Sequence, residues 1–468
     1  MQSETLQLRD YQQDLLAQTR RHLARDRRTL MVLPTGGGKT VIFCYMIARA
    51  AERGRSTLVL VHRQELLQQV SDTLNRFGVE HQKCAPNEKV SKTSLVTVAS
   101  VFSAARRLAS LPKPDLVVID EAHHCISSST WGRVLAWAKD AYCVGVTATP
   151  QRLSGEGLKE CFTSMVQGPT TAQLMEQGYL CRYKYFRPPG FSAKDIRVTA
   201  GDFNLQDAER KVNTAKISGC AVEHYEKHAN GKRAVVFCIT VDHAFDVANR
   251  FTASGHRASV LNGETPKEQR VDIVKRFNQN EIQILCSCNV ISEGFDLPAI
   301  ECAILLRPTQ SVAMYLQQVG RALRTSPNKE HAVILDHVGN VDRHGLPCDD
   351  REWSLNGRKQ TGKQDGESAI QTRMCKQCFA INQAKAEKCC VCGALLRQVE
   401  PIKADDSKEL IEIIPRKHTP LRIDRMREQR EATTLSALIE LAQRRGYKWP
   451  VAWARRIVES RKRKLTYK

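Results

Sequence analysis

The stretch Thr29-Leu30-Met31-Val32-Leu33-Pro34-Thr35-Gly36-Gly37-Gly38-Lys39-Thr40 decides how this chain folds. Its apolar start predicts a strand, and the apolar residues from Val41 onward predict a helix, so the glycines lie in the loop between the two elements. Glycine lets backbone N–H groups close around phosphate oxygens, and a helix N-terminus adds the positive end of its dipole. We therefore expect a phosphate site formed by Gly36, Gly37, Gly38, Lys39 and Thr40.

This loop departs from the strict phosphate-loop pattern, because Leu33 stands where the first glycine would be. In the expected site, Lys39 would contact the β- and γ-phosphates of ATP and Thr40 would bind Mg²⁺. The alternative is a flexible glycine turn before a helix. The second half of the loop is intact and lies between strand and helix, which favours the phosphate site.

A second buried strand, Leu116–Ile119, ends in the adjacent carboxylates Asp120 and Glu121. At the carboxyl end of a parallel strand, Asp120 could reach Mg²⁺ and Glu121 could polarise the attacking water. Such a pair could instead cap the following helix, but a phosphate loop upstream favours catalysis. His123 could couple the nucleotide site to a second lobe, and its alternative is a surface histidine.

Short apolar runs alternate with helical patterns from the N-terminus to about residue 340. The runs show little polar alternation, which is typical of parallel strands covered by helices on both faces. They predict the α/β class, with two tandem lobes separated near Pro188-Pro189-Gly190, where the pattern breaks. The predicted strands are Thr29–Leu33, Ser56–His62, Leu95–Ala99, Leu116–Ile119 and Ala141–Thr147, then Ala234–Ile239, Arg257–Leu261, Ile282–Cys286, Ala299–Leu306 and Ala332–Leu335.

The composition changes after the second lobe and predicts further parts. The expected organisation is a first lobe (1–187), an inter-lobe connection (188–233), a second lobe (234–350), a Gly/Gln/Lys/Ser-rich linker (351–372), a cysteine module (373–396) and a basic, mainly helical region (397–468). Residues 401–468 hold 18 Lys and Arg against nine Asp and Glu. Basic and aromatic residues alternate at 444–453, where they could hold phosphates and stack bases; a small bundle that packs the tryptophans inward is the alternative.

The formal net charge of +21 indicates a polyanionic partner, nucleic acid before membrane, although a solvated basic surface would also produce it. The polar start MQSETLQLRD contains no signal peptide, and no window of 18 apolar residues predicts a membrane span. Most of the 17 cysteines stand singly in apolar runs. These features predict a cytoplasmic protein in a reducing compartment.

Four cysteines form two CxxC pairs separated by ten residues, Cys375/Cys378 and Cys389/Cys392. Four thiolates at this spacing predict a closed, structural Zn²⁺ site, with Cys390 as a spare thiol. An Fe–S cluster also uses four cysteines, but the ribbon-like spacing favours zinc. Unligated core thiols are the other alternative.

Several segments resemble the ordered motifs of superfamily-two helicases. Residues 120–123 resemble the DEAH box, and 146–150 resemble the motif that links hydrolysis to lobe movement, with Thr147 and Thr149 as its hydroxyls. Residues 317–324 resemble the QxxGRxxR motif. The resemblance implies two RecA-like lobes, catalytic Gln317, and Arg321 and Arg324 reaching across the cleft to the γ-phosphate.

Two shorter segments extend this resemblance, which covers residues 5–345. Residues 290–298 resemble the motif before QxxGRxxR, where Gly294 and Asp296 match coupling positions and Ser292 replaces a common threonine. Residues 8–12 resemble the LRxYQ element, so Arg9 and Gln12 inherit contacts to adenine; an amphipathic helix start is the alternative. Segments 201–203, 335–340 and 343–347, with the cysteine module, resemble the RadD-like and phage-borne members of a group that includes type III restriction subunits and XPB.

The resemblance also implies a nucleic-acid face. Its residues would be Arg63, Gln64, Thr97, Gly263 and Ser292. Motors of this kind hold mainly backbone phosphates, so the contacts are expected to be independent of sequence. For Arg63, the strongest candidate, a solvated arginine at a helix start is the alternative.

Together these features predict an ATP-dependent DNA helicase or translocase that acts on single-stranded or forked DNA in repair, recombination or replication. A single-strand-binding protein is the kind of protein partner expected. The alternatives are an RNA helicase, an ATPase that remodels protein–DNA complexes without unwinding, and the motor subunit of a restriction enzyme. No nuclease constellation is evident in the sequence, so cleavage would require another chain.

Overall fold

The computed structural model describes residues 7–152, 155–187, 193, 196–199, 202–214, 217–288, 297, 300–357, 372–375, 377–383, 386–396, 429, 432–447 and 449–465. The chain divides into two units, Met1–Gln398 and Val399–Lys468. Among the described residues, no helix combines the length and the apolar composition needed to span a membrane.

The elements of the first unit alternate between strands and helices. The strands are β1 (Arg28–Val32), β2 (Thr57–Val61), β3 (Gln82–Cys84), β4 (Val96–Ser100), β5 (Leu116–Ile119), β6 (Tyr142–Thr147), β7 (Ser164–Gln167), β8 (Arg182–Phe186), β9 (Val198–Thr199), β10 (Asp202–Phe203), β11 (Ala234–Phe237), β12 (Ala258–Leu261), β13 (Ile284–Ser287), β14 (Cys302–Leu305), β15 (His331–Asp336), β16 (Thr372–Met374) and β17 (Ile381–Gln383). The helices are α1 (Asp10–Asp26), α2 (Lys39–Ala51), α3 (Gln64–Arg76), α4 (Val101–Arg106), α5 (Thr130–Trp137), α6 (Thr171–Glu176), α7 (Leu205–Thr214), α8 (Ile217–Ala229), α9 (Val241–Ala253), α10 (Lys267–Asn278), α11 (Val312–Ala322) and α12 (Asn340–His344). Two short 3-10 helices lie at Leu108–Ser110 and Ala122–His124.

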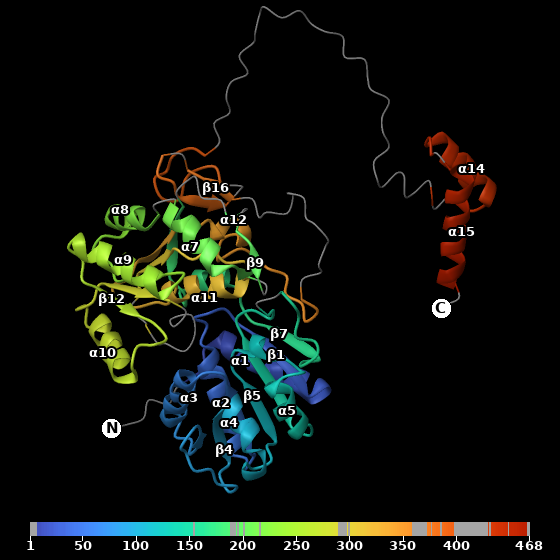
Figure 1. The fold of residues 1–468 in the computed structure, drawn as a ribbon. Helices are drawn as coiled ribbons and strands as arrows, with labels where there is room; N and C mark the ends of the chain where they lie inside the picture. The colour runs from blue at the N-terminus through green and yellow to red at the C-terminus, as the bar shows by residue number, and fades with distance from the viewer. Residues whose placement is uncertain are drawn as a thin grey trace, which may run out of the picture. The chain divides into compact units, whose positions relative to one another are not determined.

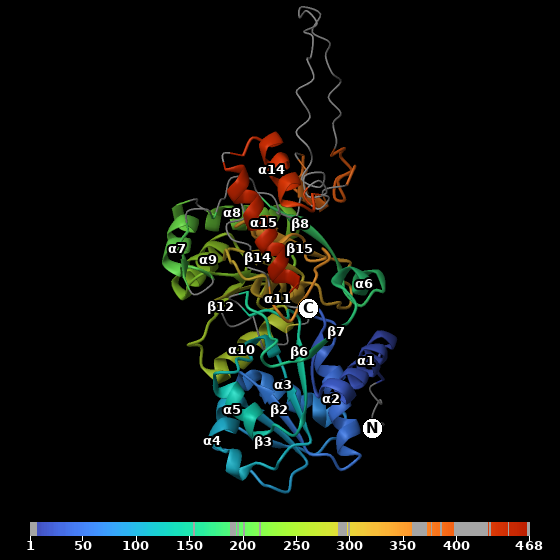
Figure 2. The ribbon, with the colours of Figure 1, turned by 90° about the vertical axis from the view of Figure 1, so that its right-hand side faces the viewer.

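The first lobe is built on a parallel sheet in the order β3-β4-β2-β5-β6-β1-β7. Successive residues of β1 point to opposite faces, so Met31 joins the core under α1, α2 and α3, whereas Leu30 and Val32 join the core under α4 and α5. Figure 2 shows this sheet between the two helical layers. Burial on both faces explains why the strands read as continuous apolar runs.

The second lobe contains a parallel sheet in the order β12-β13-β11-β14-β15-β8. Figure 1 shows the helices of this lobe, among them α8, α9, α10 and α11. Its edge strand β8 comes from residues that the sequence assigned to the first lobe, which was expected to extend to residue 187. β8 instead pairs with β15, from Arg182↔His331 to Phe186↔Leu335. The α/β class and the two parallel sheets are confirmed, but the chain enters the second sheet before the predicted boundary.

Hydroxyl side chains begin several of the helices that flank these sheets. Ser100, Ser129, Thr240 and Ser311 each accept a hydrogen bond from a backbone N–H in the first turn of the following helix. Such a cap satisfies one of the donors that a helix start leaves without an intrahelical partner. The last of these caps fixes the start of α11, the helix of the QxxGRxxR-like segment.

The start of the predicted linker 351–372 packs against the first lobe. Trp353 and Leu355 contact the core beneath α4 and α5, and the Lys159 N–H donates to the Leu355 carbonyl at 3.0 Å. The backbones of Glu156 and Gly357 form an isolated antiparallel bridge. Residues 351–357 are therefore an ordered return to the first lobe, and 358–371 lie outside the described residues.

The cysteine module contains the antiparallel strands β16 and β17 and touches the second lobe through a bridge between Phe186 and Ala380. The second unit contains a pair of helices, α14 (Leu435–Arg444) and α15 (Pro450–Leu465). Within it, Leu438, Leu441, Ala442 and Ala454 are buried, while Trp449 is 70% exposed. The Trp449 side chain is therefore not packed inside a small helical bundle, which was the alternative that the sequence offered for the tryptophans.

Candidate nucleotide site between the lobes

The glycine-rich loop follows β1 and ends as the first turn of α2. Gly36 (φ 86°) and Gly38 (φ 78°) adopt left-handed conformations, and the Gly37 N–H donates to the Pro34 carbonyl at 3.0 Å. The left-handed conformation of Gly38 disfavours any residue with a side chain, and a Cβ atom there would also displace the Gln12 amide, whose Nε2 would lie 2.5 Å away. The loop thus has the glycine-dependent turn and helix N-terminus of an anion site.

The start of α1 packs directly on this loop. The Tyr11 hydroxyl donates to the Gly37 carbonyl at 2.9 Å, and Gln12 Nε2 approaches the same oxygen at 3.5 Å. The Arg9 N–H donates to Gln12 Oε1, and the Arg9 guanidinium lies 4.4 Å from the centre of the Tyr179 ring. Arg9 and Gln12 are therefore brought beside the loop. Tyr11, to which the sequence assigned no role, makes the shortest contact.

Asp120 and Glu121 follow β5, on the same edge of the sheet as the loop. Asp120 is only 4% exposed, and burial, reinforced by Glu121, raises its pKa to about 7 against the opposing effect of Lys39. Glu121 has a positive φ of 46°, a strained conformation for a residue with a side chain. A buried carboxylate next to Lys39 fits a divalent cation, whose charge would favour the ionised form.

A polar chain links these carboxylates to the end of β6. His123 Nδ1 lies 3.3 Å from Glu121 Oε2 and 3.0 Å from Thr147 Oγ1, and the Thr147 hydroxyl donates to the Thr149 carbonyl at 2.9 Å. His123 is 2% exposed and the two threonines are fully buried, so the surface alternative for this histidine is excluded.

The second lobe closes over the phosphate loop through α11. A Cβ atom at Gly320 would lie 2.6 Å from Cβ of Thr35, and one at Gly36 would lie 2.8 Å from Leu180 and 3.5 Å from Arg324. The backbones of Leu180 and Arg324 also form a bridge. Elements separated by almost 300 residues in the chain therefore meet at the loop.

Gln317 Nε2 on α11 and the Thr149 hydroxyl after β6 are both buried, and neither has a hydrogen-bond partner among the described residues. Burying such groups unpaired costs about 1–3 kcal/mol each. Both belong to segments that the resemblance assigned to ATP hydrolysis. A bound polar ligand that formed hydrogen bonds with these two groups would remove this cost, which fits a nucleotide between the lobes.

The residues predicted to bind nucleic acid differ in their exposure to solvent, and only some of them lie in the described part of the chain. Arg63 is the residue before α3, and Gly263 is exposed in the turn after β12. Thr97 is 1% exposed and its hydroxyl accepts from Gln82 Nε2 at 2.9 Å, so its side chain is not available to a strand at the surface. The Gln64 side chain and all of Ser292, Gly294 and Asp296 lie outside the described residues.

The four predicted cysteine ligands form one cluster, in which all four sulfurs lie within 4.8 Å of one another. The Cys375–Cys392 and Cys378–Cys389 sulfur distances are 3.6 and 3.5 Å, close to the separation of about 3.8 Å in a tetrahedral site with Zn–S bonds of about 2.3 Å. Burial opposes ionisation of Cys389, but N–H groups of Cys392 and Val391 lower its pKa to about 6. The cluster could hold a metal ion, and Cys390 stays outside it.

Comparisons with known proteins match both lobes. The family described as the res subunit of type III restriction enzymes matches residues 5–152, and the helicase conserved C-terminal domain matches residues 215–326. A 51.5 kDa protein of a Lactococcus phage is 31% identical over 416 residues, covering 88% of each chain. The putative ATP-dependent helicase IRC3 of Saccharomyces cerevisiae is 28% identical over 71% of this chain and 51% of its own length.

Among solved structures, the fragment of a putative HsdR subunit of a type I restriction enzyme from Vibrio vulnificus has a TM-score of 0.55. It is 21% identical, and the match covers 72% of this chain and 66% of that one. At this identity the similarity shows a shared fold.

Proposed function

The chain belongs to the superfamily-two helicases and is an ATPase of that superfamily, and we propose that it is a DNA translocase. It couples ATP hydrolysis between its lobes to movement along one DNA strand, with duplex unwinding as the consequence. DNA repair, recombination or replication is the setting we propose for this activity.

The observation that carries the proposal is the junction of α11 with the phosphate loop. Gly320 lies against Thr35, and Arg324 lies beside Gly36, so the second lobe completes a site whose phosphate-binding part belongs to the first. A site of this kind depends on lobe closure, because moving α11 away removes its arginines from the phosphates. Hydrolysis and lobe movement are thereby coupled.

In the proposed mechanism, the loop N–H groups and Lys39 hold the β- and γ-phosphates. Thr40 and Asp120 would hold Mg²⁺, which would supply positive charge to neutralise the phosphates. Glu121 orients and polarises the attacking water. Arg321 in the last turn of α11 and Arg324 just after it stabilise the charge that develops on the γ-phosphate, and Gln317 contributes its buried amide.

The chain His123–Thr147–Thr149 would transmit the state of Glu121 to the end of β6 and from there to the lobe interface. Arg9 and Gln12 would hold the adenine. Alternate closure and opening of the lobes would then change the grip on a strand held by Arg63, Gln64, Gly263 and Ser292, and Gly294 and Asp296 would couple hydrolysis to that movement.

Two observations support DNA as the strand. The formal net charge of +21 suits a polyanion, and a relative from Sulfurisphaera tokodaii, 23% identical over 72% of this chain, is named a DNA 3'-5' translocase. We also propose that the four-cysteine cluster holds a structural Zn²⁺, since four thiolates leave no ligand position open for catalysis.

The test is ATP hydrolysis with single-stranded DNA, forked DNA, duplex DNA and RNA, measured beside displacement of a labelled strand and of streptavidin from a biotinylated oligonucleotide. DNA-stimulated hydrolysis with streptavidin displacement is expected. Stimulation by RNA alone would replace DNA with RNA in the proposal. Streptavidin displacement without strand separation would identify a remodeller. Hydrolysis that no nucleic acid stimulates would refute the proposal.

A further inference from the structure

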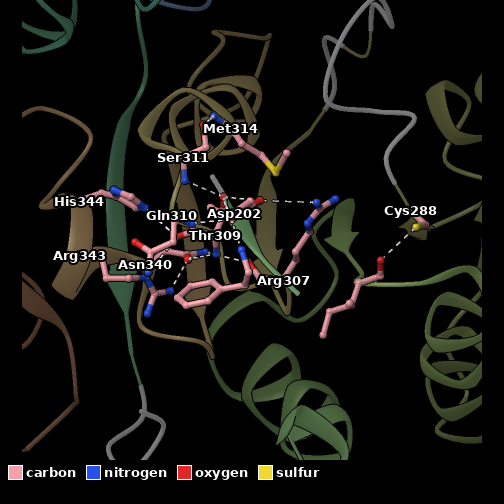
Figure 3. Close-up of polar contacts among 12 residues, drawn as sticks. Asp202, Cys288, Arg307, Thr309, Gln310, Ser311, Met314, Asn340, Arg343 and His344 are labelled. Carbon is pink, nitrogen blue, oxygen red and sulfur yellow. Dashed lines mark hydrogen bonds and ion pairs between the residues drawn. The ribbon is translucent and has the colours of Figure 1, made fainter. Parts of the chain in front are cut away.

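Three segments set aside so far converge on one loop. They contain Asp202 in the hairpin β9–β10, Asn340 at the start of α12, and Arg343 and His344 at the end of the same helix. The loop is Arg307–Ser311, which connects β14 to α11. Figure 3 shows these side chains gathered around Thr309. The proposed catalytic arginines lie in the last turn of α11 and just after it. The loop that precedes α11 therefore sets the direction in which the helix points toward the ATP site.

Asp202 holds the loop from the β9–β10 hairpin, which lies between β8 and β11 in the chain. Its carboxylate accepts from the Thr309 hydroxyl at 3.0 and 3.1 Å and from the Gln310 N–H at 2.6 Å, and it lies 3.7 Å from Arg307 Nη2. Thr309 is fully buried. Hydrogen bonds to an ionised acceptor are about twice as strong as neutral ones, so this anchor fixes the loop backbone.

The second set of contacts reaches the same residue from the other side. Asn340 accepts from the Thr309 N–H at 3.1 Å and donates to the Arg307 carbonyl at 3.1 Å. The Thr309 carbonyl accepts from Arg343 Nε at 3.2 Å and lies 2.9 Å from His344 Nε2. Every polar backbone group of Thr309 and its hydroxyl are thus fixed by side chains far away in the chain.

The anchored loop passes directly into α11. The Thr309 hydroxyl accepts from the Ser311 N–H at 3.0 Å, and the Ser311 hydroxyl caps the helix by accepting from the Met314 N–H. One turn later, the Tyr315 hydroxyl donates to the Gly345 carbonyl at 3.0 Å. A helix held at its first turn is fixed in direction, and the opposite end of α11 is the part that meets Thr35.

From these contacts we infer that Asp202 is a positioning residue for ATP hydrolysis: it acts through Thr309 and Gln310 to aim α11, and with it Arg321 and Arg324, at the phosphate loop. This inference rests on the proposed function. Asp202 does not contact the phosphate loop, so its effect must appear in turnover and not in nucleotide affinity. The segment between β8 and β11 would then control the catalytic arginines of the same lobe.

The test compares Asp202→Ala, Asp202→Asn and Arg321→Ala/Arg324→Ala in DNA-stimulated ATP hydrolysis by the full chain. For Asp202→Ala we expect kcat to fall about 10- to 100-fold, because a displacement of about 1 Å can cost about 100-fold, with the KM for ATP nearly unchanged. Asp202→Asn keeps an oxygen acceptor and should recover part of the loss. Asp207→Ala is the matched control. Asp207 forms an ion pair with Arg197 in the same segment between β8 and β11, and its replacement should leave kcat unchanged.

A double-mutant cycle separates positioning from general stability. If Asp202 acts through Arg321 and Arg324, treated together as one site of the cycle, Asp202→Ala should slow Arg321→Ala/Arg324→Ala no further. Multiplied losses, or an Asp202→Ala variant with wild-type kcat, would overturn the inference while leaving the proposed function intact. A wild-type chain without nucleic-acid-stimulated hydrolysis would instead remove the proposed function itself.

Discussion

Replacing Gly320 with alanine tests whether α11 closes directly on the phosphate loop. The added Cβ would lie 2.6 Å from Cβ and 3.0 Å from Cγ2 of Thr35. Carbon atoms normally approach to about 3.5–4.0 Å, so relief of this contact requires a separation of about 1 Å between the helix and the loop. Thr35 is short and β-branched, and it therefore cannot turn away as a long side chain would.

The size of the effect follows from this displacement. Misplacing catalytic groups by about 1 Å can lower kcat about 100-fold, which corresponds to about 2.7 kcal/mol in activation free energy. The free energy of unfolding should stay the same or rise slightly, because alanine in place of glycine within a helix usually stabilises a protein by about 0.5–1 kcal/mol. A loss of activity without a loss of melting temperature would therefore identify the contact as the cause.

The assay is steady-state ATP hydrolysis at saturating DNA, with kcat and KM measured separately and the melting temperature as the control for folding. Adding Thr35→Gly to the Gly320→Ala chain removes the clashing Cβ and should recover part of the lost kcat. Wild-type turnover in Gly320→Ala would refute the reasoning, since it would mean that hydrolysis does not use the junction between α11 and the loop.

Four further outcomes are expected. Lys39→Ala should abolish ATP hydrolysis and leave the metal content unchanged, as measured by a coupled ATPase assay and elemental analysis. Cys375→Ser should do the reverse. We expect one zinc ion per wild-type chain and less than one per variant chain, while the variant keeps much of its ATP hydrolysis. Tyr11→Phe removes a buried hydrogen bond to Gly37, so the unfolding free energy should fall by about 0.5–1.5 kcal/mol and the KM for ATP should rise. Trp353→Ala should lower the melting temperature by undocking residues 351–357 from the first lobe, and an unchanged melting temperature would contradict that docking.

The sequence predicted the central strands of both sheets because they are buried on both faces. β5, β11 and β14 consist of apolar residues alone and are fully buried, and β1 is buried from Thr29 to Val32. The residues proposed for ATP lie at the carboxyl ends of β1, β5 and β6, where a parallel sheet places its ligands. The order of the motifs along the chain was therefore enough to place them on one edge.

The edge strands could not be recognised in the same way. β8 (Arg182–Phe186) alternates polar and aromatic residues, and nothing local indicates that it pairs with β15 instead of the first sheet. β3 and β7 are short and carry few apolar residues. Contacts such as Leu180 against Gly36, or Asp202 on Thr309, join residues more than 100 positions apart and depend on the packing of whole lobes. No pattern within either segment contains that information.

The return of residues 351–357 limits how the proposed motor can open. The chain leaves the first lobe near Leu180 and comes back to it at Leu355, where the Lys159 N–H and a bridge to Glu156 hold the returning backbone. Gly157 permits this approach, since a Cβ there would lie 2.0 Å from the Leu355 carbonyl oxygen. The second lobe is thus attached to the first at two places. While both attachments hold, the lobes can rotate about them but cannot separate freely, so the opening that releases ADP must be a limited hinge movement.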